Sequence, residues 1–268
     1  MRIIDLSLPI DDSVSETHPV EIERWEHRSG GDRLGKLWAR SQGIKGRMKH
    51  ITGKERITRD CFKDGLFLSL EWVRATVHSG THLDAPYHYG PYSEGKPAKK
   101  IEDIPLEWCY GDGVVLDCSD KGAGEVITEA DIKKALGKIK YKIKPFDIVL
   151  IHTGADKLWG TKKYFSHYVA LSRDALAYIV NFEVKVIGVD IFSLDRPLPA
   201  MVRDFLKTKD NSYLWPVHFY GREKEYCHIE RLANLDKIPQ PYGFKVACFP
   251  VKIKGAGAAW VRAVAIIE

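Results

Sequence analysis

Three short apolar runs, with chain suited to helices between them, limit most strongly what this sequence can fold into. Each run is rich in β-branched residues and is bounded by Gly, Pro or charge. They are GVVLD at 113–117, DIVLIH at 147–152 and VKVIGVD at 184–190. Runs of this length and composition predict buried strands.

Two helices are expected between these strands. In the segment TEADIKKALGK, Thr128 and Asp131 have the spacing of a capping box, and Gly137 is placed to end the helix. The segment SRDALAYIV begins with Ser172 as a candidate N-cap and links the second and third runs. The pattern therefore predicts a βαβ unit.

The end of the chain has a different pattern. FKVACFPVKI and WVRAVAII (260–267) have strand composition, and the Gly-rich segment KGAGAA lies between them. We expect a hairpin that closes the chain. Without repeats or low-complexity tracts, the whole sequence predicts a mixed α/β fold and a single domain over residues 1–268.

Residues 24–66 are the least regular part of the sequence. This stretch is basic, interrupted by glycine and only weakly periodic. It is compatible with a nucleic-acid-binding arm, a lid over a site, or a solvated excursion with one short helix. Because basic stretches usually face water and few aromatic residues are interleaved here, we expect a lid or a solvated excursion.

Composition narrows the class of protein. The chain has 268 residues, of which 44% are hydrophobic and 29% are charged, as in soluble globular proteins. The 41 basic and 36 acidic residues leave a charge of +5, too small by itself to hold a polyanion, so no nucleic-acid partner is expected.

Cysteine usage and the N-terminal sequence point to a cytoplasmic protein. The five cysteines include no CxxC pair, which favours free thiols in a reducing compartment. Asp5, Asp11 and Asp12 interrupt the region where a signal peptide needs an apolar core. No apolar run reaches the roughly 18 residues that span a bilayer, so no membrane partner is expected.

The segment HSGTHLDAPYH, which begins at His78, places three histidines and an aspartate within eleven residues. The preceding residues alternate as in a strand, so His78 is expected near a strand end. Gly80 and Pro86 argue against a helix through His82 and Asp84. A strand that runs into a turn can still direct these side chains to one point.

Two imidazoles and a carboxylate are a familiar ligand set for a catalytic Zn²⁺ or Mn²⁺ that keeps positions open for water. His88 then lies near the ion without needing to bind it, and a neutral imidazole there can transfer protons. A single histidine in a turn is more often a hydrogen-bonding residue than a ligand, but a cluster of this density is unusual.

The pattern resembles the HxGTHxDxPxH signature of the metal-dependent hydrolases of the cyclase family, which includes bacterial kynurenine formamidase and isatin hydrolase. All seven fixed positions match. The similarity extends over most of the chain, through IIDLSLPI, GVVLD, DIVLIHTG, VIGVDIFSLD and WVRAVAII. The resemblance implies that His78, His82 and Asp84 bind the metal and that His88 is the catalytic proton-transfer residue.

In the formamidase branch of the family a further histidine and glutamate complete the site. The segment WPVHFYGREKEYCHIERLANL resembles that pattern with His218 and Glu230. These two residues either hold a second metal ion or hydrogen-bond His88 and the metal-bound water. His152, His167 and His228 are expected to have no role in the site, although His228 competes with His218 by position.

The resemblance also implies a swivelling β/β/α layered fold, a homo-oligomer and zinc or manganese as cofactor. The expected reaction is hydrolysis of an amide, cyclic amide or lactone bond in a small substrate. The metal lowers the pKa of its bound water, and His88 acts first as base and then as acid. The long 24–66 stretch is more similar to isatin hydrolases or other cyclase-like members than to the compact kynurenine formamidases.

Three aromatic residues near the motif segments, Trp72, Phe192 and Trp215, are candidates for a flat-substrate pocket or for the core. Two other functions remain open. A metal-dependent lyase or cyclase would use the same ligands to polarise a carbonyl. A non-catalytic protein stabilised by metal would instead need a closed coordination sphere.

Overall fold

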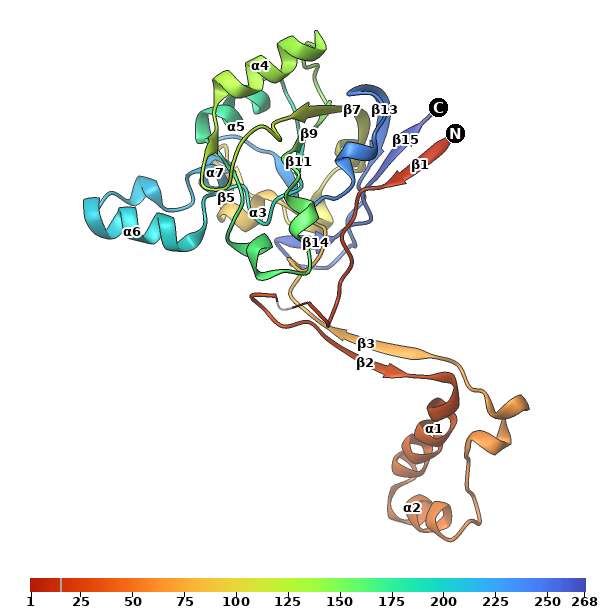
Figure 1. The fold of residues 1–268 in the computed structure, drawn as a ribbon. Coiled ribbons are helices and arrows are strands. Elements are labelled where there is room, and N and C mark those ends of the chain that lie inside the picture. Colours follow the sequence, from red (N-terminus) through yellow and green to blue (C-terminus); the bar gives the residue numbers. More distant parts are fainter. Residues whose placement is uncertain (15) are drawn as a thin grey trace. The chain divides into compact units, whose positions relative to one another are not determined.

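The three apolar runs form neighbouring parallel strands of a nine-stranded sheet. All three are labelled in Figure 1. They are β7 (Tyr110–Asp117), β9 (Ile148–His152) and β11 (Val186–Val189). All four residues of β11 and the first four of β9 are buried. The prediction of buried strands is therefore confirmed.

Helix α4 (Glu129–Ile139) begins at the predicted capping box. Thr128 Oγ1 accepts a hydrogen bond from the Asp131 N–H at 3.3 Å, and Asp131 Oδ2 accepts one from the Thr128 N–H at 2.9 Å. The predicted end at Gly137 is wrong. The helix continues two residues further, because Lys140 itself adopts the left-handed conformation at the C-cap, with φ 53°.

Helix α5 (Arg173–Val180) begins as expected, with Ser172 Oγ accepting a hydrogen bond from the Ala175 N–H at 3.1 Å. The helix connects β9 to β11, and these two strands pair in parallel. The predicted βαβ unit is therefore confirmed.

The strand order of the large sheet is β1-β15-β13-β7-β9-β11-β12-β4-β14. Strand β15 is the second strand of this order and β14 is the last. In the chain, however, only residues 261–263 separate them. The sheet must therefore curl until its two ends approach each other. The strands not yet located are β1 (Arg2–Asp5), β4 (His82–Asp84), β12 (Cys227–Glu230), β13 (Tyr242–Ala247), β14 (Ala258–Trp260) and β15 (Val264–Ile267).

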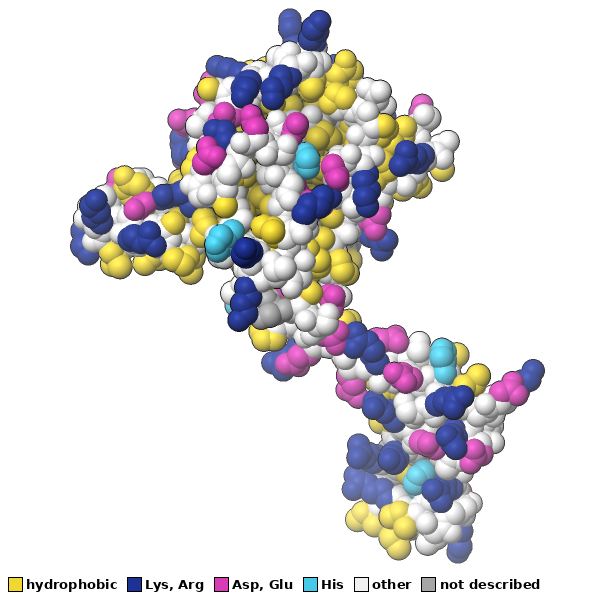
Figure 2. Space-filling view, in the orientation of Figure 1, with side chains coloured by type: hydrophobic (Ala, Val, Ile, Leu, Met, Phe, Trp, Pro, Cys, Tyr) yellow, Lys and Arg dark blue, Asp and Glu magenta, His cyan; other side chains and the backbone are white. Residues whose placement is uncertain are grey.

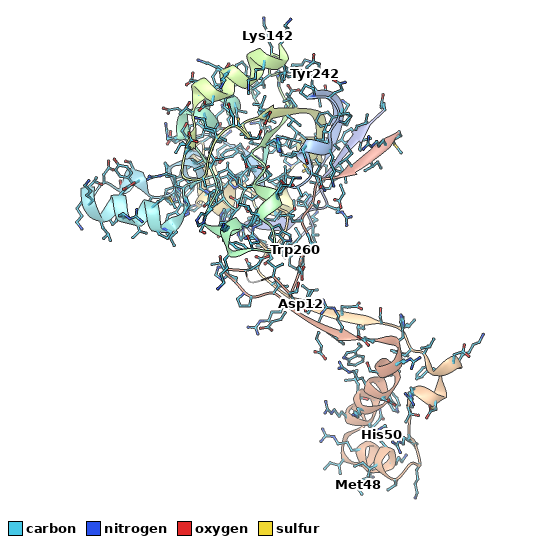
Figure 3. The ribbon with its side chains drawn as sticks, in the orientation of Figure 1. Asp12, Met48, His50, Lys142, Tyr242 and Trp260 are labelled. Atoms are coloured by element: carbon cyan, nitrogen blue, oxygen red, sulfur yellow. The ribbon has the colours of Figure 1, made fainter. Side chains whose placement is uncertain are left out.

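The expected closing hairpin is only partly correct. Strands β13 and β15 do pair antiparallel, with Lys245 opposite Ile266. Trp260, however, belongs to β14, which pairs with β4 at the far end of the sheet order. Its ring, labelled in Figure 3, donates a hydrogen bond from Nε1 to the Thr76 carbonyl at 3.0 Å. The apolar run at 260–267 therefore contributes to strands near both ends of the sheet order.

Each face of the sheet packs against its own hydrophobic core. Helices α4 and α5 bury their apolar faces against one side, where Leu116 and Ile151 lie. The other side, with Leu150 and Ile229, faces the interior of the curl. Burial of this apolar area is the main stabilising term of the fold. The five cysteines are all free thiols, as predicted.

Three further helices and two small ribbons accompany the large sheet. The helices are α3 (Pro86–Tyr89), α6 (Leu198–Thr208) and α7 (Pro216–Tyr220). Two-residue strands form two further ribbons, β5 (Tyr92–Ser93) with β6 (Lys96–Pro97) and β8 (Val126–Ile127) with β10 (Ala170–Leu171). Within the described part of the chain, no helix has the length and apolarity required to cross a membrane.

The structure is a computed structural model that describes residues 1–14 and 16–268, and these form two compact units. The curled sheet and its helices belong to the larger unit, residues 1–19 and 76–268. The smaller unit is 20–75 and contains the irregular 24–66 stretch. The mixed α/β class predicted from the sequence is confirmed.

The smaller unit consists of an antiparallel ribbon and two helices. The ribbon pairs β2 (Glu21–Trp25) with β3 (Leu70–Arg74), and the helices are α1 (His27–Ser41) and α2 (Gly43–Ile51). Lysine and arginine side chains are spread over its visible surface in Figure 2, with acidic side chains among them. With two helices, the 24–66 stretch is more helical than the one short helix expected from its sequence. Its role as a lid stays a prediction.

Candidate metal centre

The turn before β4 positions the histidine-rich motif. Gly80 has φ +60°, and a Cβ there would lie 3.1 Å from the Pro9 carbonyl oxygen, so both the conformation and the close approach favour glycine. Next to it, Thr81 Oγ1 accepts a hydrogen bond from the Leu8 N–H at 2.7 Å and donates one to the Arg231 carbonyl. One side chain therefore ties the motif to the N-terminal segment and to the end of β12.

Strand pairing brings four polar side chains together. His82 and Asp84 are two residues apart on β4 and therefore point to the same face of the sheet. On the neighbouring strand β12, Glu230 lies opposite His82, and His228 lies opposite Asp84. Side chains that face each other across antiparallel strands share one face. The four groups thus form one cluster on a single face.

Helix α3 brings the last histidine of the motif to this cluster. Pro86 is its first residue, which suits the fixed φ of proline, and His88 lies two residues further. Gly257, just before β14, packs against this histidine, because a Cβ on that glycine would lie 3.2 Å from the His88 Cα. The Gly257 carbonyl also accepts a hydrogen bond from the Ala85 N–H at 2.8 Å.

The hydrogen bonds of His82 determine which of its ring nitrogens is free. Nδ1 lies 3.0 Å from the Gly80 carbonyl oxygen, which can only accept, so Nδ1 carries the proton and Nε2 keeps its lone pair. Nε2 is buried and has no hydrogen-bond partner among the described residues. Burial lowers the pKa of His82 to about 4. The ring is therefore neutral and able to act as a ligand.

The two carboxylate oxygens of Asp84 face different neighbours. Oδ1 lies 3.0 Å from His78 Nδ1 and 3.6 Å from His82 Nε2, yet it makes no hydrogen bond within the described chain. Oδ2 lies 2.9 Å from His228 Nε2. Burial would raise the pKa of Asp84, but the nearby imidazoles, His88 first, outweigh it and hold that pKa well below its usual range.

The unpartnered Nε2 of His82 and Oδ1 of Asp84 are suitable ligand atoms for a divalent metal ion. An unpartnered buried lone pair on His82 and one on Asp84 are each costly unless something binds them. Together with His78 they offer three ligand atoms within 4.8 Å of one another. Two imidazoles with one carboxylate suit Zn²⁺ or Mn²⁺. The donor set predicted from the sequence is thus assembled in one place.

His218 and Glu230 also lie at this cluster. His218 Nδ1 is 2.6 Å from Asp195 Oδ2, so it donates to that carboxylate and leaves Nε2 free, 3.6 Å from Glu230 Oε1. The other carboxylate oxygen, Glu230 Oε2, lies 3.6 Å from His82 Nε2. Burial would raise the pKa of Glu230, but His228 outweighs it and lowers that pKa to about 2.

Two members of the cluster were missed by the sequence interpretation. His228 was expected to have no role, but it is fully buried and contacts Asp84 Oδ2. Asp195, which orients His218, was not considered. The position of His228 two residues before Glu230 would have placed it on the same face, had that segment been identified as a strand.

The other histidines set aside from the sequence lie outside the cluster. His152 Nδ1 is 3.4 Å from Asp117 Oδ1, and His167 Nδ1 is 2.8 Å from Ser166 Oγ. Of the three aromatic candidates, Trp72 belongs to the smaller unit. Phe192 packs against the helix-side core, and Trp215 precedes α7, the helix that carries His218.

Two of the motif's histidines are partly exposed to solvent. The side chains of His78 and His88 are 30% and 33% exposed, whereas those of His82, Asp84 and His228 are fully buried. The rings of His78 and His88 lie 4.4 Å apart. These two imidazoles are thus the most exposed side chains of the motif's histidines and aspartate.

Comparison with known proteins identifies the family of this chain. The sequence model of the Cyclase family, described as "Putative cyclase", matches residues 4–196. Isatin hydrolase from Roseibium aggregatum is 26% identical over 221 residues, which cover 76% of this chain and 77% of that protein. Cyclase-like protein 1 from Arabidopsis thaliana is 24% identical over 94% of this chain and 83% of that protein.

Solved structures share the fold. An isatin hydrolase bound to the product analogue thioisatinate superposes with a TM-score of 0.72 at 20% identity, over 99% of this chain and 92% of that one. Isatin hydrolase A from Ralstonia solanacearum gives a TM-score of 0.71 at 21% identity, over 100% of this chain and 92% of that one. Because the family model spans well over half of the chain and includes the whole motif, this protein belongs to the Cyclase family.

Proposed function

We propose that this protein is a metal-dependent hydrolase that cleaves an amide, cyclic amide or lactone bond in a small substrate, aromatic substrates included. One observation carries the proposal. The buried, unpartnered Nε2 of His82 and Oδ1 of Asp84 belong to the same cluster as the partly exposed imidazole of His88. Ligand atoms next to a proton-transfer group are the minimum that hydrolysis by activated water requires.

His78, His82 and Asp84 would hold the ion, Zn²⁺ or Mn²⁺. When bound, such an ion lowers the pKa of water and polarises the carbonyl that is attacked. The protein contributes the arrangement of these ligands. The Gly80 carbonyl accepts a hydrogen bond from His82 Nδ1–H, and the imidazole neighbours of Asp84 keep its carboxylate ionised by lowering its pKa.

His88 is suited to move the proton. Burial lowers the pKa of His88 from its ordinary value, and Asp84 opposes this only in part, so the ring is neutral near pH 7. Its Nε2 lies 3.7 Å from Asp84 Oδ2 and therefore faces the cluster. We propose that Nε2 takes a proton from the attacking water and returns it to the leaving nitrogen or oxygen. An amide nitrogen leaves poorly without that proton.

Asp195, His218 and Glu230 complete the wall of the site. Asp195 accepts from the backbone N–H groups of Val217 and His218 as well as from the His218 ring, which fixes this imidazole in place. One hydrogen bond to the ring and two to the backbone of the same turn, all accepted by one carboxylate, keep this imidazole in its orientation. His218 is thus suited to contact the substrate or an ion through Nε2.

The substrate class rests on the relatives. Relatives of this chain include an isatin hydrolase, named for a cyclic amide, and cyclase-like proteins named for no substrate. This supports cyclic amides as the first class to test. Oligomerisation and a cytoplasmic location remain predictions from the sequence and its resemblance.

A lyase or cyclase that uses the same residues is the alternative, because polarising a carbonyl needs the same ligands and His88. Isotopic labelling separates the two. In water enriched in heavy oxygen, hydrolysis places one labelled oxygen in the product, whereas a lyase or cyclase product carries none.

The test is a panel of isatin, formyl-anilines, cyclic imides and lactones, incubated with protein loaded with Zn²⁺ or Mn²⁺. We expect ring opening or deformylation of at least one compound, with incorporation of solvent oxygen. The same panel with the His82→Ala variant is the control and should be inactive. Turnover that is equal in this variant would show that the cluster is not the active site.

A further inference from the structure

Helix α2 of the smaller unit turns its apolar side toward solvent. Ile44, Met48 and Ile51 have the spacing i, i+4 and i+7, so they lie on one side of the helix. Their exposed fractions are 81%, 55% and 75%. Gly46 lies on the opposite side and packs against α1, because a Cβ there would be 2.8 Å from the Ala39 carbonyl oxygen. The apolar side of α2 therefore faces away from α1.

Basic side chains flank this apolar side. Successive residues of a helix are about 100° apart around its axis, which places Arg47 at one edge of the apolar side and Lys45 and Lys49 at the other. In Figure 2 hydrophobic side chains gather at the end of this unit where Figure 3 labels Met48, and lysine and arginine side chains lie beside them. The helix thus presents an apolar stripe with cations along both edges.

The net charge of the whole protein lies in the smaller unit. Residues 20–75 contain 13 basic and 8 acidic residues, a net +5, which equals the formal charge of the entire chain. Within this unit, residues 36–56 contain seven basic residues and a single acidic one, Glu55. The larger unit has no net charge. An anionic partner is therefore attracted to the α1–α2 hairpin first.

A small hollow between α1 and α2 adjoins the apolar stripe. Its volume is about 190 Å³, and Ile51 belongs both to its wall and to the stripe. The polar residues of the wall are Lys36, Arg40, Arg47 and His50. Within residues 1–14 and 16–268 the three cations form no ion pair, and His50 Nδ1 is buried without a hydrogen-bond partner. Such a set of unpaired donors suits the oxygens of a phosphate group.

The stripe and the hollow together select one kind of partner. A second copy of the stripe would bring its Lys45, Arg47 and Lys49 against the same three cations, and like charges repel. Nucleic acid supplies phosphates but has no apolar surface along its backbone for the exposed stripe. A membrane with anionic phospholipids supplies both phosphate groups and acyl chains.

We propose that the α1–α2 hairpin is a docking surface for membranes that contain anionic phospholipids. Helix α2 lies along the membrane surface with Ile44, Met48 and Ile51 at the upper ends of the acyl chains, and the hollow holds a headgroup phosphate. The expectation of no membrane partner rested on the short apolar runs of the sequence. A helix that lies on a membrane needs no spanning run. This docking does not depend on the metal centre.

The test measures co-sedimentation of the full-length protein with vesicles of phosphatidylcholine, alone or mixed with phosphatidylglycerol. We expect binding to the anionic vesicles only, with an affinity that falls as the salt concentration rises. Ile51→Gln should weaken this binding on the order of tenfold, because burial of one such side chain contributes about that factor. Arg40→Gln combined with Arg47→Gln should weaken it by on the order of tenfold or more, since two cations are lost from the hollow.

Matched controls come from exposed residues of the larger unit. Leu106→Gln and the pair Lys138→Gln with Lys252→Gln remove the same kinds of side chain and should bind like the wild type. All the replaced side chains are exposed, so the variants should fold. Equal binding to both kinds of vesicle, binding to neither, or undiminished binding by Ile51→Gln would overturn the proposal.

Three further measurements on the wild type identify a different occupant, and each would also overturn the proposal. Self-association that Ile51→Gln abolishes, without vesicle binding, would assign the stripe to a second copy. Affinity for duplex DNA that matches the affinity for anionic vesicles would assign the hairpin to nucleic acid. Binding of inorganic phosphate without vesicle binding would leave the hollow as a site for a free anion.

Discussion

Glu230 lies directly opposite His82 across strands β12 and β4, and its Oε2 is 3.6 Å from His82 Nε2. The residues are 148 positions apart in the chain, so only the antiparallel register of these strands brings them together. A shift of one residue in that register would turn Glu230 to the other face of the sheet, into the core that contains Ile229. The register of β12 is thus a requirement for the site as well as for packing.

Removing a ligand should remove the metal. We expect His82→Ala and Asp84→Ala to lose bound zinc, measured by elemental analysis after dialysis, because each contributes a buried atom with no other partner. His167→Ala should retain it. Chelation of the wild type should abolish activity but leave the circular dichroism spectrum largely unchanged, since two extended cores stabilise the fold. Full zinc occupancy in both ligand variants would contradict the assignment.

His88 should matter for turnover and not for metal binding. His88→Ala is expected to keep its metal and to lose on the order of 10² to 10⁴ in kcat, the usual contribution of a general acid–base group. Metal content and kcat measured on the same preparation distinguish the roles. Loss of the metal in this variant would make His88 a ligand and would require another base.

The pH dependence of kcat/KM should reflect the lowered pKa of His88. A base whose pKa is below 6.5 remains unprotonated to lower pH, so activity should fall only below the ordinary histidine value. This acidic limb should be absent from the residual activity of His88→Ala. A wild-type limb centred well above 6.5 would assign the essential base to a different group.

The contact between Gly257 and His88 predicts a selective loss of activity. In Gly257→Ala the new Cβ would lie 3.2 Å from the His88 Cα, which displaces helix α3 by a few tenths of an ångström. We expect kcat to fall while zinc stays bound. Gly137→Ala is the matched control, because its Cβ would meet nothing within 4 Å and alanine favours helix α4 by up to about 1 kcal/mol. Equal activities of the two variants would rule out the contact as a constraint.

The capping box of α4 predicts a pH-dependent contribution to stability. Burial by itself would raise the pKa of Asp131, but the hydrogen bonds from Thr128 and Lys121 together outweigh it and lower that pKa to about 2. A lowered carboxylate pKa stabilises the fold above the unfolded-state value, and this stabilisation is lost as the pH falls from about 4 to about 2. Asp131→Ala should therefore cost about 1 kcal/mol in urea unfolding at neutral pH.

The difference between wild type and Asp131→Ala should shrink steadily over that acidic range. Asp174→Ala, a change in the first turn of α5 without a capping box, is the comparison. A difference in unfolding free energy that stayed constant from pH 7 to about pH 2 would show that the hydrogen bonds do not require the ionised carboxylate.

Local sequence determined the elements whose signals lie within a few residues. The buried strands follow from their β-branched composition, and α4 and α5 begin where Thr128 and Ser172 satisfy the first free N–H groups. The sequence also determined the donor set of the motif. His82 and Asp84 are two residues apart on one strand, so they face the same way wherever that strand lies.

Only the tertiary structure decided what surrounds that donor set. His228 and Asp195 became part of the site through strand pairing and the packing of α7. Asp195 has no local pattern that indicates it, and the spacing of His228 from Glu230 is informative only once that segment is known to be a strand. The run at 260–267 was divided between two strands because the sheet curls, which no window of sequence reveals. The periodicity of a sequence indicates which way each side chain points. Register and curvature decide which side chains meet, and both depend on strands that are far apart in the chain.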